Sequence, residues 1–154
     1  MDQNKRGLIT ALGAGVAAMW GASKAQANAF PGDSASHKIV YQLNHADPEY
    51  IEHILNSIAA VLSKYVDDVA VAVVAFGPGI HLLATQPGRD IPELQRQRIK
   101  GMAENYGVQL IACGNTMKSL KWGRQHIIAQ AEIQEVGAAA LMELQEQGYA
   151  YVAW

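Results

Sequence analysis

The chain has a single cysteine, Cys113, in the segment LIACGNTM, where an apolar run gives way to small polar residues. Gly114 can adopt backbone angles that other residues avoid, and Asn115 and Thr116 have side chains that cap helices. If the apolar run is a strand and a helix follows it, the sulfur faces the amino end of that helix. Free N–H groups and the helix dipole favour an anion there, which lowers the pKa of a thiol and increases its thiolate fraction. The segment therefore predicts a reactive thiol at a strand-to-helix turn.

The alternative interpretation is that Cys113 is a core residue. Free cysteines are among the most frequently buried residues, and many of them lie at the ends of strands. Lys118, Lys121 and Arg124 add positive charge downstream, but such a run is typical of a solvated surface. The spacing alone leaves both interpretations open.

Two further segments follow predicted strands, Asn44-His45 after the first and Gly77-Pro78-Gly79 after the second. The carboxyl ends of parallel strands meet at one edge of a sheet, where ligands bind in this class of fold. His45, and His81 just after the glycine-rich turn, are each a candidate base for the thiol or an ordinary hydrogen-bonded loop residue. The predicted pocket around Cys113 consists of Asn44, His45, Gly77, Gly79, His81, Gly114, Asn115 and Thr116.

Several other kinds of site lack their sequence signals. One cysteine and scattered histidines without i, i+4 spacing predict no metal site, and no cofactor is expected. The Gly77-Pro78-Gly79 turn does not have the spacing of a phosphate-binding loop, and no Gly-x-Ser-x-Gly nucleophile elbow occurs. A net charge of −2 without a basic stripe argues against nucleic acid as a partner.

The elements that position these residues alternate between strand and helix. Asp47-Pro48 is a strong helix start, and the Val-rich run from Val69 to Phe76 is typical of a strand covered on both faces. The predicted second helix begins at Pro92, has Leu94, Ile99, Met102 and Tyr106 as its apolar members, and stops at Gly107. Residues 80–84 are ambiguous.

Strands are expected at 38–43, 69–76, 108–113, 131–136 and 149–154, and helices at 48–64, 92–106, 138–146 and, briefly, after 115. This order predicts an α/β fold, a three-layer α/β/α sandwich with a mainly parallel sheet of about five strands.

The first 29 residues have the features of a signal peptide. Lys5-Arg6 precede an apolar stretch from Leu8 to Gly21, and two A-x-A cleavage patterns follow. The Lys-Arg pair and the weakly apolar stretch are similar to a twin-arginine signal. Because the stretch is shorter than the ~20 residues of a spanning helix, no permanent membrane anchor is expected. The sequence thus predicts a signal peptide (1–29), a linker (30–37) and a folded domain (38–154) in the periplasm, with an amphipathic helix that stays on the protein as the alternative.

The segments KIVYQLNH, VAVVAFGPGIHLL, NYGVQLIACGNTM and VGAAALMELQEQGYAYV together resemble the DsrE/DsrF-like family from residue 38 to the end of the chain. The resemblance implies a compact α/β/α domain that assembles into homo-oligomers, trimers or hexamers. In the family a cysteine carries sulfur as a persulfide within a relay, and its position corresponds to Cys113. The partners implied are sulfur donor and acceptor proteins or small thiols.

These observations lead to a main hypothesis and two alternatives. In the main one, a periplasmic sulfur-handling protein uses Cys113 to accept and pass sulfane sulfur as a persulfide. In the second, the protein is a non-catalytic ligand-binding or oligomeric assembly module with a structural Cys113. A third, redox sensing, would need an intermolecular partner thiol, since the chain has no second cysteine.

Overall fold

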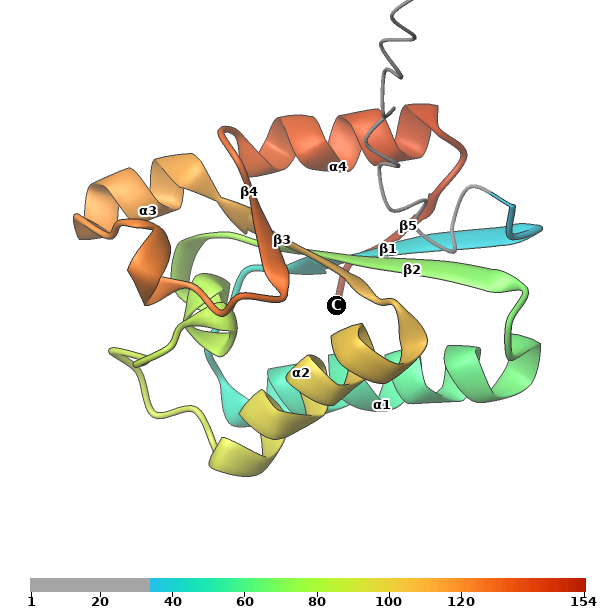
Figure 1. The fold of residues 1–154 in the computed structure, drawn as a ribbon, viewed down its shortest axis with the longest axis horizontal. Coiled ribbons are helices and arrows are strands. Elements are labelled where there is room, and N and C mark those ends of the chain that lie inside the picture. The colour runs from blue at the N-terminus through green and yellow to red at the C-terminus, as the bar shows by residue number, and fades with distance from the viewer. Residues whose placement is uncertain (1–33) are drawn as a thin grey trace, which may run out of the picture.

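A computed structural model describes residues 34–154, which form one five-stranded sheet with strand order β4-β3-β2-β1-β5 (Figure 1). Every pair of neighbouring strands is parallel. The elements in chain order are β1 (His37–Leu43), α1 (Pro48–Tyr65), β2 (Val69–Ala75), η2 (Gly77–Leu83), α2 (Glu93–Tyr106), β3 (Gln109–Cys113), α3 (Gly114–Leu120), η3 (Arg124–His126), β4 (Ala131–Gln134), α4 (Gly137–Glu146) and β5 (Ala150–Val152).

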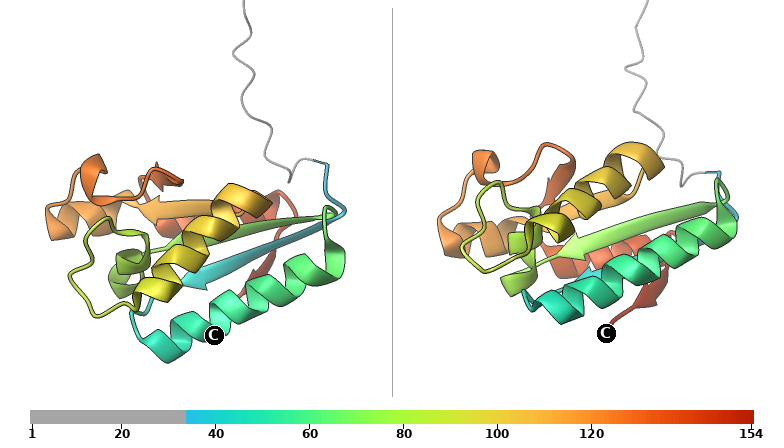
Figure 2. Two further views of the ribbon diagram at one scale, coloured as in Figure 1. Left: turned by 60° about the horizontal axis from the view of Figure 1, so that its bottom comes forward. Right: turned by 90° about the horizontal axis from the view of Figure 1, so that it is seen from below.

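Helices cover both faces of the sheet, so the predicted three-layer α/β/α sandwich is confirmed. Helices α1 and α2 lie side by side on one face, and α4 lies on the other (Figures 1 and 2). The central strand β2 is buried along its whole length, because its alternate side chains enter the two cores on opposite faces. Its uninterrupted run of Val and Ala is the sequence signature of that position.

Local sequence signals account for the ends of the helices. Asp47 caps α1 by accepting a hydrogen bond from the backbone N–H of Tyr50 (2.9 Å), and Pro48 occupies the first helical position. Gly107 ends α2 in the left-handed conformation, with φ of 67°. These caps fix where the chain turns back toward each strand.

The structure settles one segment that the sequence left ambiguous and corrects one expectation about α2. Residues 80–84 were ambiguous, and most of them belong to the 3₁₀ helix η2. In α2, Ile99 and Met102 are buried, but Leu94 and Tyr106 are exposed. Gln95 takes a buried place instead, since its amide group donates to the carbonyl of Pro48 and to the carboxylate of Glu52.

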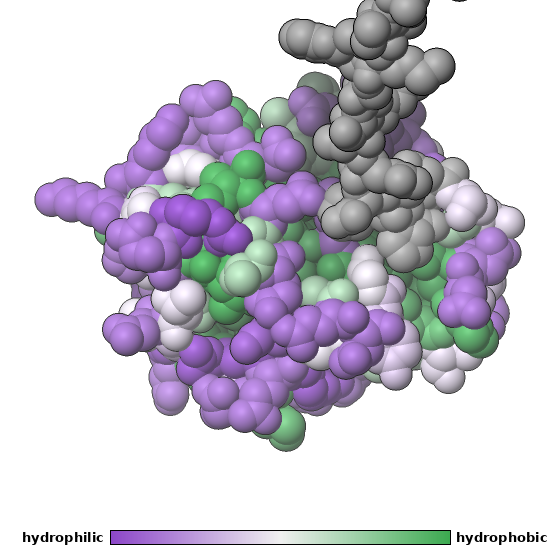
Figure 3. Space-filling model, viewed as in Figure 1, coloured by the Kyte–Doolittle hydropathy of each residue, from purple (hydrophilic) through white to green (hydrophobic). Residues whose placement is uncertain are grey.

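Hydrophilic residues cover most of the face seen in Figure 3, with smaller apolar patches between them. Within residues 34–154, no helix combines the length and the apolar character needed to cross a bilayer. The predicted signal peptide, and residues 30–33 of the predicted linker, lie outside the described residues.

Candidate functional site at the carboxyl edge of the sheet

Cys113 lies between the starts of two helices. It is the last residue of β3 and is followed directly by α3. Its neighbour across the sheet is Gln134, the last residue of β4, and α4 begins at Gly137. Because β3 and β4 are parallel neighbours, both strand-to-helix turns emerge at the same edge, and the sulfur lies where they meet.

Two glycines allow these turns to pack closely. A Cβ atom on Gly114 would lie 3.2 Å from Cα of Glu135 and 3.3 Å from the carbonyl oxygen of Gln134. A Cβ atom on Gly137 would lie 3.0 Å from Cβ and 3.3 Å from Sγ of Cys113. Such distances are shorter than ordinary van der Waals contacts, so a side chain at either position would push the turns apart. The absent side chains bring backbone amides up to the sulfur.

Backbone donors surround the sulfur. The N–H of Gly137, the first residue of α4, donates a hydrogen bond to Sγ of Cys113 (3.2 Å). Burial raises the pKa of the Cys113 thiol. Hydrogen bonding from the backbone of Thr116 and Gly137, the hydroxyl of Thr116 and the backbone of Asn115 outweighs burial and leaves this pKa below its ordinary value. The site therefore favours the thiolate.

The sulfur is also well enclosed. Cys113 is 6% exposed, and the half-buried ring of Phe76 lies near it, beside Gly137. The core interpretation predicted burial and the reactive interpretation predicted amide donors, and the structure combines both features. Little of Cys113 is therefore accessible to a reagent.

The turn after β2 meets the Cys113 turn through Thr116. The backbone N–H of Gly77 donates to Oγ1 of Thr116 (3.0 Å). Gly79 packs against the end of β1, where a Cβ atom would lie 2.2 Å from the carbonyl oxygen of Leu43. Asn44 is adjacent, and its side-chain oxygen accepts a hydrogen bond from the hydroxyl of Tyr50 (2.9 Å). The ends of β1, β2 and β3 thus form one continuous surface.

The two candidate bases lie apart from the thiol. His81 is buried, its Nδ1 accepts a hydrogen bond from the N–H of Gly88 (3.0 Å), and its ring packs edge-on against Trp122. Burial, together with the nearby positive charge of Arg89, lowers the pKa of His81. His45 is exposed and packs against Tyr50. Neither histidine forms a hydrogen bond with Cys113 in the described part of the chain.

Two hollows lie along this edge on either side of Pro78 and Arg89. One of about 300 Å³ is lined by Gly77, Pro78, His81, Arg89, Thr116 and Ser119, among others. The other, of about 390 Å³, contains His45 and the carboxylate residues Asp47 and Asp90. Sequence reasoning missed Arg89, because it lies in the polar loop 85–90 that only the fold returns to this edge.

The described residues offer no cluster of side chains suited to a metal ion. The site consists of a cysteine with a lowered thiol pKa, backbone donors and an adjoining hollow. Backbone amides that donate to a sulfur can stabilise a thiolate. It defines an α/β/α domain with a single enclosed thiol at the carboxyl edge of its sheet.

The chain belongs to the DsrE/DsrF-like family, whose model matches residues 37–154. Among solved structures, it is similar to MTH1491, a protein of unknown function from Methanobacterium thermoautotrophicum, with a TM-score of 0.67 and 18% sequence identity. The match covers 77% of this chain and 99% of the other, and it supports the fold. No curated protein matches the chain. Membership of the family indicates a sulfur-relay type of function in general terms.

Proposed function

We propose that the protein carries sulfane sulfur on Cys113 as a persulfide. The observation that supports this most directly is the hydrogen bond from Gly137 to the sulfur, in a site where the thiol pKa is lowered despite burial. The sulfur of a neutral thiol is only a weak acceptor for such donors, whereas a thiolate is strongly stabilised by them. The family to which the chain belongs gives the reaction its type.

The proposed reaction is a sulfur transfer between thiolates. The Cys113 thiolate attacks the terminal sulfur of a donor, a new S–S bond forms, and the donor group leaves with the electron pair of the bond that breaks. An acceptor thiolate then attacks the outer sulfur and regenerates the Cys113 thiolate. No net oxidant is needed, because each step exchanges one S–S bond for another.

The enclosure of the site suits a carrier. A persulfide on an exposed cysteine meets any thiol in solution, whereas the 6% exposure of Cys113 limits the contact of its sulfur with other thiols. Burial therefore protects the cargo.

We further propose that the chain is exported to the periplasm and acts there as a homo-oligomer, a trimer or hexamer. The features of residues 1–29 motivate the first proposal, and the family motivates the second. Mass spectrometry of the protein from a periplasmic fraction should find a mature amino terminus between residues 27 and 30. Light scattering of that protein measures the oligomer. An intact amino terminus or a monomer would contradict the respective proposal.

Intact-mass measurement after incubation with polysulfide tests the persulfide directly. We expect the wild-type protein to gain the mass of one or more sulfur atoms, to lose it on reduction, and the Cys113→Ser variant to gain none. Transfer of the added sulfur to a small acceptor thiol completes the test. If the protein gains no sulfur under conditions that load a known carrier, the proposal is wrong.

The near-complete burial of Cys113 favours a second candidate, a binding or assembly module with a structural cysteine. In that case iodoacetamide should not alkylate Cys113 in the native protein. The Cys113→Ala variant should then keep the fold, the assembly state and any cellular phenotype. Rapid alkylation of the native protein at neutral pH would exclude this candidate.

A further inference from the structure

The 300 Å³ hollow beside the thiol has the features of an anion site, and we call it the Arg89 pocket. None of the residues that line it is acidic. Thr116 is the link to Cys113, since its backbone and hydroxyl act on the sulfur and it also lines the pocket. A molecule held in this pocket is therefore separated from Cys113 by Thr116, the residue that the pocket and the sulfur share.

His81 presents an unused donor to the Arg89 pocket. Because its Nδ1 accepts the hydrogen bond from Gly88, the proton of the neutral ring is on Nε2. Among the described residues, Nε2 has no hydrogen-bond partner, and it is not fully enclosed, since the one fully buried side-chain N or O atom without a partner there is Oε1 of Gln95. Because His81 lines the hollow, this N–H group is available to a ligand held there.

Arg89 is the second unused donor. Within residues 34–154 its guanidinium takes part in no hydrogen bond or ion pair, although the carboxylate residue Asp90 is adjacent in sequence. By contrast, two arginines within residues 34–154 form ion pairs, Arg96 with Glu93 and Arg98 with Glu52. Arg89 is exposed and lines this hollow, and an arginine fork without a carboxylate partner matches the geometry of an oxyanion.

We propose that the Arg89 pocket binds the oxyanion end of the sulfur donor, which makes the donor a small sulfur oxyanion of the thiosulfate type. Arg89 and the Nε2–H of His81 hold the sulfonate oxygens, and the outer sulfur points toward Cys113. This inference rests on the proposed function for the transfer step, but the binding of the anion is independent of it.

The step balances without a further reagent. The Cys113 thiolate attacks the outer sulfur of thiosulfate, an S–S bond forms to Cys113, and the S–S bond within thiosulfate breaks. The electron pair of the broken bond leaves with sulfite. The total charge is conserved, because a singly charged thiolate and doubly charged thiosulfate give a singly charged persulfide and doubly charged sulfite. The positive charge of Arg89 holds the oxyanion and stabilises the leaving sulfite.

A titration of inorganic thiosulfate into the isotope-labelled Cys113→Ser protein, followed by amide NMR shifts, tests binding without reaction. We expect saturable shifts at Gly77, Gly88 and Thr116, and at least tenfold weaker binding in the Cys113→Ser/Arg89→Gln protein, because a charge-assisted pair is lost. The matched control is Lys100→Gln on the same background. It removes the same charge from an exposed residue of α2 and should leave the affinity unchanged. The absence of saturable shifts, or equal affinity in the Arg89→Gln and Lys100→Gln proteins, would overturn the anion pocket.

Loading of proteins that retain Cys113 then separates the two proposals. We expect Arg89→Gln to slow persulfide formation from thiosulfate about tenfold relative to Lys100→Gln, while alkylation by neutral iodoacetamide stays within twofold in both. If the wild-type protein loads from polysulfide but Arg89→Gln does not slow loading from thiosulfate, the donor class is wrong and the persulfide function stands. If thiosulfate binds but no donor loads Cys113, the persulfide function is wrong and the anion pocket stands.

Discussion

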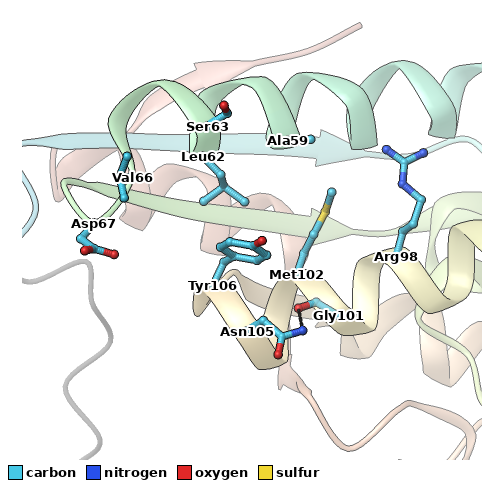
Figure 4. Close-up of a pocket in the computed structure, with 10 residues that line it drawn as sticks. All are labelled: Ala59, Leu62, Ser63, Val66, Asp67, Arg98, Gly101, Met102, Asn105 and Tyr106. Carbon is cyan, nitrogen blue, oxygen red and sulfur yellow. Dashed lines mark hydrogen bonds between the residues drawn. The ribbon is translucent and has the colours of Figure 1, made fainter.

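The two ends of the sheet carry different kinds of hollow. At the amino ends of the strands, a groove of about 580 Å³ runs between the carboxyl-terminal parts of α1 and α2 (Figure 4). Leu62, Met102 and Tyr106 give it an apolar lining, and Arg98 at its rim is already paired with Glu52 (2.5 Å). At the carboxyl ends, the Arg89 pocket is about half that volume, but it has unpaired donors and a thiol with a lowered pKa beside it.

In this fold, the volume of a hollow and the chemical groups that line it are separate properties. In parallel α/β sheets, the strand-to-helix turns converge at the carboxyl edge and present free backbone N–H groups there. At the amino edge, the helices arrive with their carboxyl ends and present free backbone C=O groups instead. The glycines follow the same division. Gly79 and Gly137 are in tight contacts at the carboxyl edge, whereas a Cβ atom on Gly101 in the groove would make only an ordinary contact with Asn105.

The largest expected effect is that of Gly79→Ala. Its new Cβ atom would lie 2.2 Å from the backbone oxygen of Leu43, and a backbone cannot move aside as a side chain can. We expect the free energy of unfolding to fall by about 3 kcal/mol, the upper part of the range for overpacking. Urea unfolding followed by circular dichroism measures it. A loss of less than about 1 kcal/mol would show that the ends of β1 and β2 are not tightly locked.

Gly137→Ala should act on the thiol more than on the fold. The added methyl group, 3.3 Å from Sγ, would displace the sulfur and lengthen the hydrogen bond from the α4 amide. We expect the pKa of Cys113 to rise toward its ordinary value and the unfolding free energy to fall by about 1–2 kcal/mol. The pH dependence of iodoacetamide alkylation measures this pKa. An unchanged pKa would mean that the Gly137 amide does not stabilise the thiolate.

The lowered pKa also predicts how stability varies with pH. A thiol with a folded pKa below its unfolded value of about 8.5 stabilises the fold fully above that pH, and the contribution disappears as pH falls through the folded pKa. The difference in unfolding free energy between the wild-type protein and Cys113→Ala should therefore grow with rising pH and level off above about 9. Urea titrations across this pH range measure the difference. A constant difference would indicate the same thiol pKa in both states.

The smallest effect should come from Gly101→Ala in the groove, and it should be of opposite sign. The nearest atom to the new Cβ is Nδ2 of Asn105 at 3.7 Å, an ordinary contact, and the position lies inside α2. Alanine is the better helix former, so we expect the unfolding free energy to rise by about 0.5–1 kcal/mol. The alkylation rate of Cys113 should not change. Destabilisation, or a change in that rate, would show that the two ends of the sheet are coupled.

The fold could be predicted from the sequence because its signals are local. The alternation of strands and helices, the cap at Asp47, the stop at Gly107 and the fully apolar run of β2 each depend on a few neighbouring residues. The position of Cys113 at the end of a strand, before a helix, was readable for the same reason. The exposed places of Leu94 and Tyr106 could not be read, because which side of α2 is buried depends on its packing against the sheet.

The sequence by itself determined that a lone thiol would stand at a strand-to-helix turn of a parallel α/β domain. Only the tertiary structure decided what surrounds this thiol. It brings the amide of Gly137, 24 residues away, to the sulfur, and it encloses the sulfur. It also keeps His45 and His81 apart from the thiol and places Arg89 in the hollow that Thr116 lines. The physical reason is that the backbone conformation of a short segment is favoured by the residues of that segment. A contact across the sheet edge forms only after separate turns, each with its own loop, have been brought to the same place by strand pairing.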